Sequence, residues 1–162
     1  MAKYEELIEE LKSVNPEEAA RLEEEIDIIV HKLKFLPAES YSNVILLNQQ
    51  EDFEPYTSTA IAEKVKIAGG NLMDSLDANP DKIIIIQQDE SLYSTLPLLL
   101  NQPTIIHSKA FTNNEIYIIH RIEFDKEDID YLADTEILAE ILQPKYFFYG
   151  RDGVDWVKFE TN

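Results

Sequence analysis

Residues 82–87 (KIIIIQ) place four isoleucines in a row, and this run constrains the fold more than any other feature of the sequence. Successive side chains of a strand point to opposite faces, so a strand of this composition is apolar on both sides. Such strands lie inside parallel sheets whose two faces are covered by helices. We therefore expect an α/β fold with residues 82–87 as a central strand.

Other segments alternate between strand-like and helix-like patterns. Short apolar runs predict strands at residues 43–49, 104–107 and 115–120. Amphipathic spacing predicts helices at residues 3–13, 16–36, 56–68, 91–100 and 128–142, the last with Ile129 facing inward. A glycine-containing loop between residues 146–149 and 154–159 predicts a terminal hairpin. The expected fold is a three-layer α/β/α sandwich with a small, mostly parallel sheet, a long N-terminal helix and a C-terminal β-hairpin.

The length of 162 residues suits one domain with a substantial core. Acidic residues concentrate in the N-terminal helical stretch and give that stretch a composition of its own. We therefore divide the chain into a helical arm, residues 1–36, and an α/β lobe, residues 37–162.

The charge balance excludes several classes of partner. The chain has 32 Asp and Glu against 14 Lys and Arg, a net charge of −18. Such a chain repels phosphate backbones and anionic lipid surfaces, so we expect neither a nucleic-acid partner nor a membrane partner. Cysteine is absent, which excludes disulfides and thiolate metal sites. With only four glycines the usual phosphate-binding loops are excluded as well, and we expect no cofactor.

The first residues do not follow the pattern of a secretory signal. Carboxylates begin at Glu5, where a signal peptide would continue into 7–15 apolar residues. The longest apolar runs also fall far short of the roughly 20 residues of a membrane helix. We therefore expect a cytoplasmic protein.

Four motifs occur in an informative order: AGGN at residues 68–71, NPDK at 79–82, NNEIYII at 113–119 and EILAEILQP at 136–144. Together with the long helix before them, they resemble the C-terminal half of class III substrate-binding proteins of ABC importers. That family carries siderophores, haem, cobalamin or metals, and a rigid helix joins its two α/β lobes. The resemblance covers residues 17–147 and implies a single lobe of this fold.

Departures from the family pattern bear on function. The family has another lobe before the long helix, with the ligand between the lobes, so the resemblance implies that half of the cleft is absent here. Family members also carry a glutamate that docks the lobe onto its permease. Met73, followed by Asp74, occupies that position in this chain, so the docking role is not carried over.

Polar residues follow two of the predicted strands. Because the carboxyl ends of parallel strands meet at one edge of the sheet, where α/β proteins bind ligands, we expect these residues to line one site. A solvated loop is the alternative, and a paired-carboxylate hydrolase or divalent-cation site is a further one. The candidate ligand residues are Gln49, Gln50, Asp52, Gln87, Gln88, Asp89 and Ser91.

Two further sets of residues are candidates. His107 and His120, on strands predicted to be neighbours, form a candidate metal pair; ordinary hydrogen-bonded histidines are the alternative. The arm carries apolar residues that fold back on the lobe or pair with a second chain, and an aromatic tail either packs on the lobe or meets a partner. This candidate interaction surface consists of Tyr4, Leu7, Ile8, Leu11 and Trp156.

These observations favour a non-enzymatic, cytoplasmic interaction or small-ligand-binding module derived from a substrate-binding-protein lobe. We expect it to form a homo-oligomer, with a homodimer through the arm as the simplest form, or to bind a protein partner. The alternative is a truncated or partner-assembled component of an ABC uptake system for metal complexes or corrinoids. A metal-dependent hydrolase is the third hypothesis.

Overall fold

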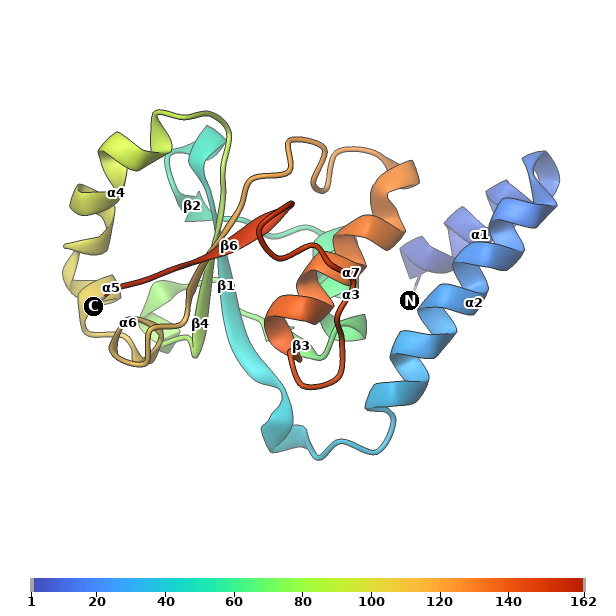
Figure 1. The fold of residues 1–162 in the computed structure, drawn as a ribbon, viewed down its shortest axis with the longest axis horizontal. Helices are drawn as coiled ribbons and strands as arrows, with labels where there is room; N and C mark the ends of the chain where they lie inside the picture. The colour runs from blue at the N-terminus through green and yellow to red at the C-terminus, as the bar shows by residue number, and fades with distance from the viewer. Residues whose placement is uncertain (1, 162) are drawn as a thin grey trace. The chain divides into compact units, whose positions relative to one another are not determined.

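The computed structural model describes residues 2–161, which form an α/β fold with seven α-helices and a mixed sheet of six strands (Figure 1). The chain divides into two compact units. The helical unit comprises the chain up to Tyr41, Ser58–Gly70 and Glu123–Tyr149, and the sheet unit comprises Ser42–Thr57, Asn71–Ile122 and the chain from Gly150. The N-terminal helices thus share a unit with later helices, whereas the sequence-based division separated residues 1–36 from the rest.

Three parallel strands form the centre of the sheet: β1 (Ser42–Asn48), β4 (Lys82–Ile86) and β5 (Ile116–Ile119). β2 (Glu54–Pro55) and β6 (Trp156–Phe159) flank them antiparallel, in the order β2-β1-β4-β5-β6. The short strand β3 (Gly70–Leu72) also pairs with β1. The prediction of an apolar central strand is confirmed.

The register of the parallel strands aligns their carboxyl ends. Asn48 of β1 lies opposite Ile86 of β4, which lies opposite Ile119 of β5. The isoleucines of β4 from Ile83 to Ile85 are fully buried, as their composition requires. One face of this sheet packs in the sheet unit with α4 (Leu92–Leu100) and its successors.

The prediction of a strand at residues 104–107 is wrong. Pro103 opens a short helix there, α5 (Pro103–Ile106), and Ser108 caps the next one, α6 (Lys109–Thr112). Proline is preorganised for the first helical position, and a short apolar run has no periodicity that separates strand from helix. Residues 87–115 are therefore a wholly helical and looped crossover between two parallel strands.

The predicted terminal hairpin is also absent. Residues 146–149 form no strand, whereas β6 forms and pairs antiparallel with β5. Gly150 and Gly153 adopt the positive φ angles of 78° and 83° that turn the chain before β6. The open edge of β5 supplies the hydrogen-bond partners that the hairpin would have supplied.

In the helical unit, α1 (Ala2–Val14) and α2 (Pro16–Leu33) form an α-helical hairpin (Figure 1). Asn15 ends α1 and caps α2, because its side-chain oxygen accepts the N–H of Glu18 at 3.3 Å. The apolar side chains Tyr4, Leu7 and Ile8 are buried, as the fold-back alternative for the arm requires.

Two further helices complete the helical unit: α3 (Thr59–Ile67) and α7 (Tyr131–Leu142), which follows a single 3-10 turn at Asp128–Asp130. The prediction that Ile129 faces inward is wrong. Its side chain is 86% exposed, because the 3-10 turn breaks the α-helical spacing on which the prediction depends. Within residues 2–161, no helix combines the length and the apolar character needed to cross a membrane.

Candidate functional site

The carboxyl ends of β1 and β4 bring together residues separated by about 40 positions. Gln49, directly after β1, lies at the centre of this edge site. Its amide nitrogen donates to Asp89 Oδ1 and to Ser91 Oγ, both at 3.1 Å. Its amide oxygen accepts the backbone N–H groups of Gln88 at 2.6 Å and of Asp89 at 3.0 Å. One side chain thus fixes the loop after β4 to the end of β1.

Asp89 is held in its ionised form at this edge. Ser91 donates to Asp89 Oδ1 from its hydroxyl at 2.5 Å and from its backbone N–H at 2.9 Å. The hydroxyl donation, followed by the backbone donation, lowers the pKa of the Asp89 carboxyl below its ordinary value. An exposed carboxylate of fixed orientation is a group that can accept hydrogen bonds from a ligand or attract a positive charge.

Gln87 leaves one acceptor unused at the same edge. Its amide nitrogen donates to the backbone oxygen of Asp89 at 3.1 Å. Its amide oxygen is buried and has no hydrogen-bond partner among the described residues. A buried acceptor without a partner is destabilising, and a ligand donor that reached it would remove that penalty.

The structure therefore assembles most of the predicted edge residues. Gln49, Gln87, Asp89 and Ser91 are linked by side-chain hydrogen bonds, and Gln88 takes part through its backbone. Gln50 and Asp52 are exposed on the turn after β1 and belong to none of these bonds. Whether any of these residues binds a ligand stays a prediction.

The two loops of the edge carry carboxylates without a balancing cation. Residues 49–54 and 87–91 contain Glu51, Asp52, Glu54, Asp89 and Glu90 and neither lysine nor arginine. These two loops therefore add only negative charge to the edge, which favours cationic or neutral ligands over anionic ones near them.

The two candidate metal ligands do not lie on neighbouring strands. His107 is exposed at the C-terminus of α5, which replaces the predicted strand. His120 follows β5, and its backbone N–H donates to the Asp155 carbonyl at 2.9 Å. In the described part of the chain, no three His, Cys, Asp or Glu side chains group into a metal-binding set. The expectation of a histidine pair built on adjacent strands is therefore wrong.

The candidate interaction residues also have defined positions. Trp156 is buried in the sheet unit against Tyr117, with ring centroids 5.7 Å apart in an edge-on arrangement. Leu11 is half-buried, in contrast to the buried residues Tyr4, Leu7 and Ile8 of the same helix. Four of the five predicted interaction residues are thus buried within the chain, so the prediction that they form an open interaction surface is wrong, and of the five Leu11 alone is partly exposed.

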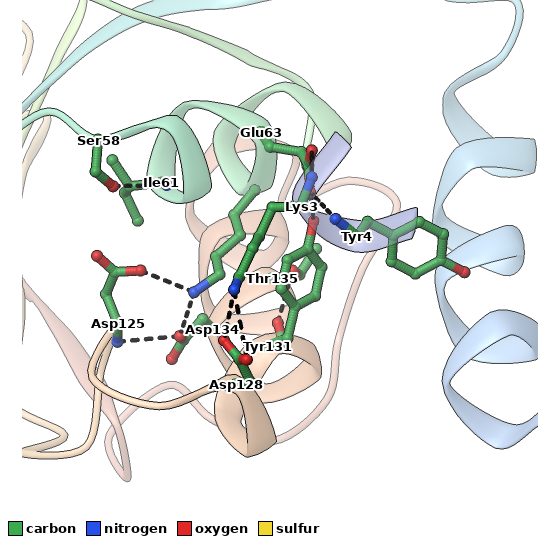
Figure 2. A network of polar contacts seen from close by, with 11 residues as sticks. Lys3, Tyr4, Ser58, Ile61, Glu63, Asp125, Asp128, Tyr131, Asp134 and Thr135 are labelled. Carbon is green, nitrogen blue, oxygen red and sulfur yellow. Dashed lines mark hydrogen bonds and ion pairs between the residues drawn. The ribbon is translucent and has the colours of Figure 1, made fainter. Parts of the chain in front are cut away.

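A second polar cluster lies inside the helical unit and escaped the sequence analysis (Figure 2). Lys64 Nζ contacts Asp125 Oδ1 and Asp134 Oδ2, each at 2.8 Å, and both Lys64 and Asp134 are buried. Burial raises the pKa of Asp134 to about 6, although Lys64 opposes that shift. Burial disfavours the charged form of Lys64, but the two aspartates outweigh it and raise the pKa of Lys64.

Glu63, next to Lys64, holds the start of the arm. Its carboxylate accepts the backbone N–H groups of Lys3 at 3.0 Å and of Tyr4 at 2.7 Å, together with the Tyr131 hydroxyl at 2.5 Å (Figure 2). The first N–H groups of a helix have no partner within the helix, so this carboxylate from α3 caps α1. The sequence signal for the cluster was a lysine between Ile61 and Val65 on the buried side of α3.

Searches with the sequence find no match to a protein-family model and no significant relative among curated proteins. Solved structures do match. A substrate-binding protein of an ABC transporter from Listeria monocytogenes EGD-e has a TM-score of 0.68 and 19% identity, over 85% of this chain and 63% of that chain. S. aureus IsdE, solved with haem, has a TM-score of 0.67 and 18% identity, over 87% of this chain and 64% of that chain.

The chain has the fold of these substrate-binding proteins. Helicobacter pylori CeuE, solved as a Ni-His complex, agrees with a TM-score of 0.58 and 17% identity, over 93% of this chain and 53% of that chain. The resemblance drawn from the four sequence motifs is thus confirmed at the level of fold. The chain spans less than two thirds of the length of each of these three structures.

Proposed function

We propose that this chain is a non-enzymatic lobe that binds a small ligand at the carboxyl edge of its parallel strands. The observation that carries the proposal is the ordered set of Gln49, Asp89 and Ser91, which converge from two loops and fix one another. Groups that are held in place before binding lose little conformational entropy when a ligand arrives. The fold shared with substrate-binding proteins supports a ligand-binding role.

The charge of the edge defines the class of ligand that we propose. Carboxylates in both loops and an ionised Asp89 favour a neutral or cationic ligand that carries hydrogen-bond donors. The buried amide oxygen of Gln87 is an additional acceptor for such a donor. A neutral or cationic metal complex fits these properties, and a polyanion does not.

Isothermal titration calorimetry with defined probes tests this proposal. The probes are cyanocobalamin, a cationic ferric trihydroxamate and nickel–histidine, with haem as the anionic comparison. We expect at least one neutral or cationic probe to bind with a Kd of about 10 μM or tighter. The change Asp89→Asn keeps the shape of the side chain and removes its charge, so binding of a cationic probe should weaken about tenfold.

Asp77→Asn in the sheet unit is the matched control, because Asp77 is also an exposed carboxylate and belongs to another loop. It should leave the Kd unchanged. If none of the three probes binds below about 100 μM, or if both variants weaken binding equally, the edge site is not the binding site.

A partner-assembled binding component of an uptake system is the second candidate function. The observation that favours it is the fold shared with a substrate-binding protein of an ABC transporter, of whose length this chain spans 63%. In that case the probes bind tightly only when a second protein completes the site.

A cytoplasmic location and a homodimer remain predictions, which cell fractionation and light-scattering mass measurement test directly.

A further inference from the structure

An open apolar groove runs along the helical hairpin on the helical unit. We call it the hairpin groove; its volume is about 570 Å³. α1, α2 and the segment around the start of α7 form its walls. Its apolar lining consists of Leu7, Leu11, Val14, Leu22, Ile129 and Leu132.

The groove combines a buried floor with exposed apolar walls. Leu7 and Leu22 are buried and form part of the unit's core. Val14 is 82% exposed and Ile129 is 86% exposed, although both line the same groove. Single exposed apolar residues are ordinary, but several that share one concave surface are typical of a binding surface.

The polar rim of the groove is acidic. Glu10, Glu18 and Asp128 stand against one cation, Arg21, whose guanidinium already pairs with Glu18 at 3.3 Å. The two helices of the hairpin carry ten carboxylates and four lysines or arginines between residues 2 and 33. A cationic occupant therefore gains electrostatic energy along the whole rim, and its approach is steered by the field.

The same charges disfavour other occupants. A second copy of the chain brings another net charge of −18 to the contact, and an anionic membrane surface is repelled likewise. The lining of the groove on α1 runs from Leu7 to Val14, which is about 12 Å, so it offers a surface that matches about two turns of a helix. Helices that bind in grooves insert apolar residues spaced by three, four and seven positions.

We propose that the hairpin groove binds a basic amphipathic helix of a partner protein. The apolar stripe of that helix covers Val14 and Ile129, and its lysines or arginines face Glu10, Glu18 and Asp128. This surface belongs to the helical unit and differs from the ligand edge of the sheet unit, so the two proposals succeed or fail independently.

A designed peptide tests the proposal with the full chain. The probe is a fluorescein-labelled 14-residue helix former that has leucines at positions i, i+3, i+4 and i+7 and lysines elsewhere. A scrambled peptide of the same composition and a leucine–glutamate counterpart are the comparison probes. In fluorescence anisotropy at 150 mM NaCl, we expect only the patterned basic peptide to bind below about 50 μM.

Variants locate the contact. Val14→Ser and Ile129→Ser remove exposed apolar contacts, so each should weaken peptide binding at least fivefold without lowering thermal stability. Phe148→Ser is the matched control, because Phe148 is 86% exposed in the same unit and lies outside the groove. Amide chemical-shift changes on adding the peptide should cluster in α1, α2 and residues 128–132.

Three outcomes overturn the proposal. The first is equal binding of the patterned and scrambled peptides, which would show unspecific charge attraction. The second is equal affinity of wild type, Val14→Ser and Ile129→Ser. The third is a light-scattering mass of a dimer that Ile129→Ser converts to a monomer, which would make a second copy the occupant.

Discussion

The buried Lys64 cluster allows a quantitative test of what stabilises the helical unit. The change Lys64→Met keeps most of the side-chain volume and removes the charge that faces Asp125 and Asp134. Asp134 is fully buried, and its Oδ1 has no hydrogen-bond partner in the described part of the chain. Removing one member of a buried ion pair leaves an uncompensated charge and costs about 3–5 kcal/mol.

Urea unfolding at pH 7.5 measures this cost. With a slope of about 2 kcal/mol per molar urea, the midpoint should fall by about 2 M. Far-UV circular dichroism follows the helices, and fluorescence of Trp156, the only tryptophan, follows the sheet unit. The cluster lies wholly in the helical unit. If circular dichroism and tryptophan fluorescence then give different urea midpoints, the two units unfold separately.

The same variant has a distinct pH dependence. Without Lys64, the carboxylate of Asp134 takes up a proton more readily, so the cost should be smaller at pH 5 than at pH 7.5. Lys66→Met, two positions along α3 at an exposed site, is the matched control and should cost less than about 1 kcal/mol. A loss below about 1 kcal/mol for Lys64→Met, or one equal to that of the control, would refute the reasoning.

Three further predictions concern the same unit. The folded pKa of Asp134 is about 6 and lies above its ordinary value of 3.8. The stability that Asp134 contributes is therefore present at pH 4 and is lost as the pH rises through 6. Asp134→Asn should remove this fall in the free energy of unfolding from denaturation curves measured between pH 4 and 7. Gly69→Ala should cost more than about 1 kcal/mol in thermal unfolding, because φ is +96° and the new Cβ would lie 2.7 Å from Gln143 Cγ. Glu63→Gln weakens the capping of α1, so the amide of Tyr4 should exchange at least tenfold faster, at a cost of about 1–2 kcal/mol in stability.

The successes of the sequence analysis depend on composition that admits one solution. Four consecutive isoleucines are β-branched and apolar on both faces, which favours a covered strand, and β4 forms there with its centre fully buried. The topology then determines which loops meet, so Gln49 and Asp89 could be placed at one edge before any coordinates were known. Capping chemistry likewise located the start of α2 at Asn15 and Pro16.

The failures occur where a local pattern has two physical readings. The short apolar run at residues 104–107 has no periodicity of its own, and Pro103 turned it into a helix. Ile129 fitted the helical spacing, but a 3-10 turn rotates it outward. The contacts of Lys64 with Asp125 and Asp134 join residues 61 and 70 positions apart, and one sequence without its topology does not pair them.

The chain alternates between the helical and the sheet unit in six successive segments. Neither unit is therefore a contiguous stretch of the gene, and no single truncation yields one of them intact. During synthesis the helical unit stays incomplete until Tyr149 has left the ribosome, and the sheet unit waits for its last strand, β6. Because β6 follows soon after Tyr149, the two units become complete almost together as the chain is made, and neither offers the other a finished partner on which to fold.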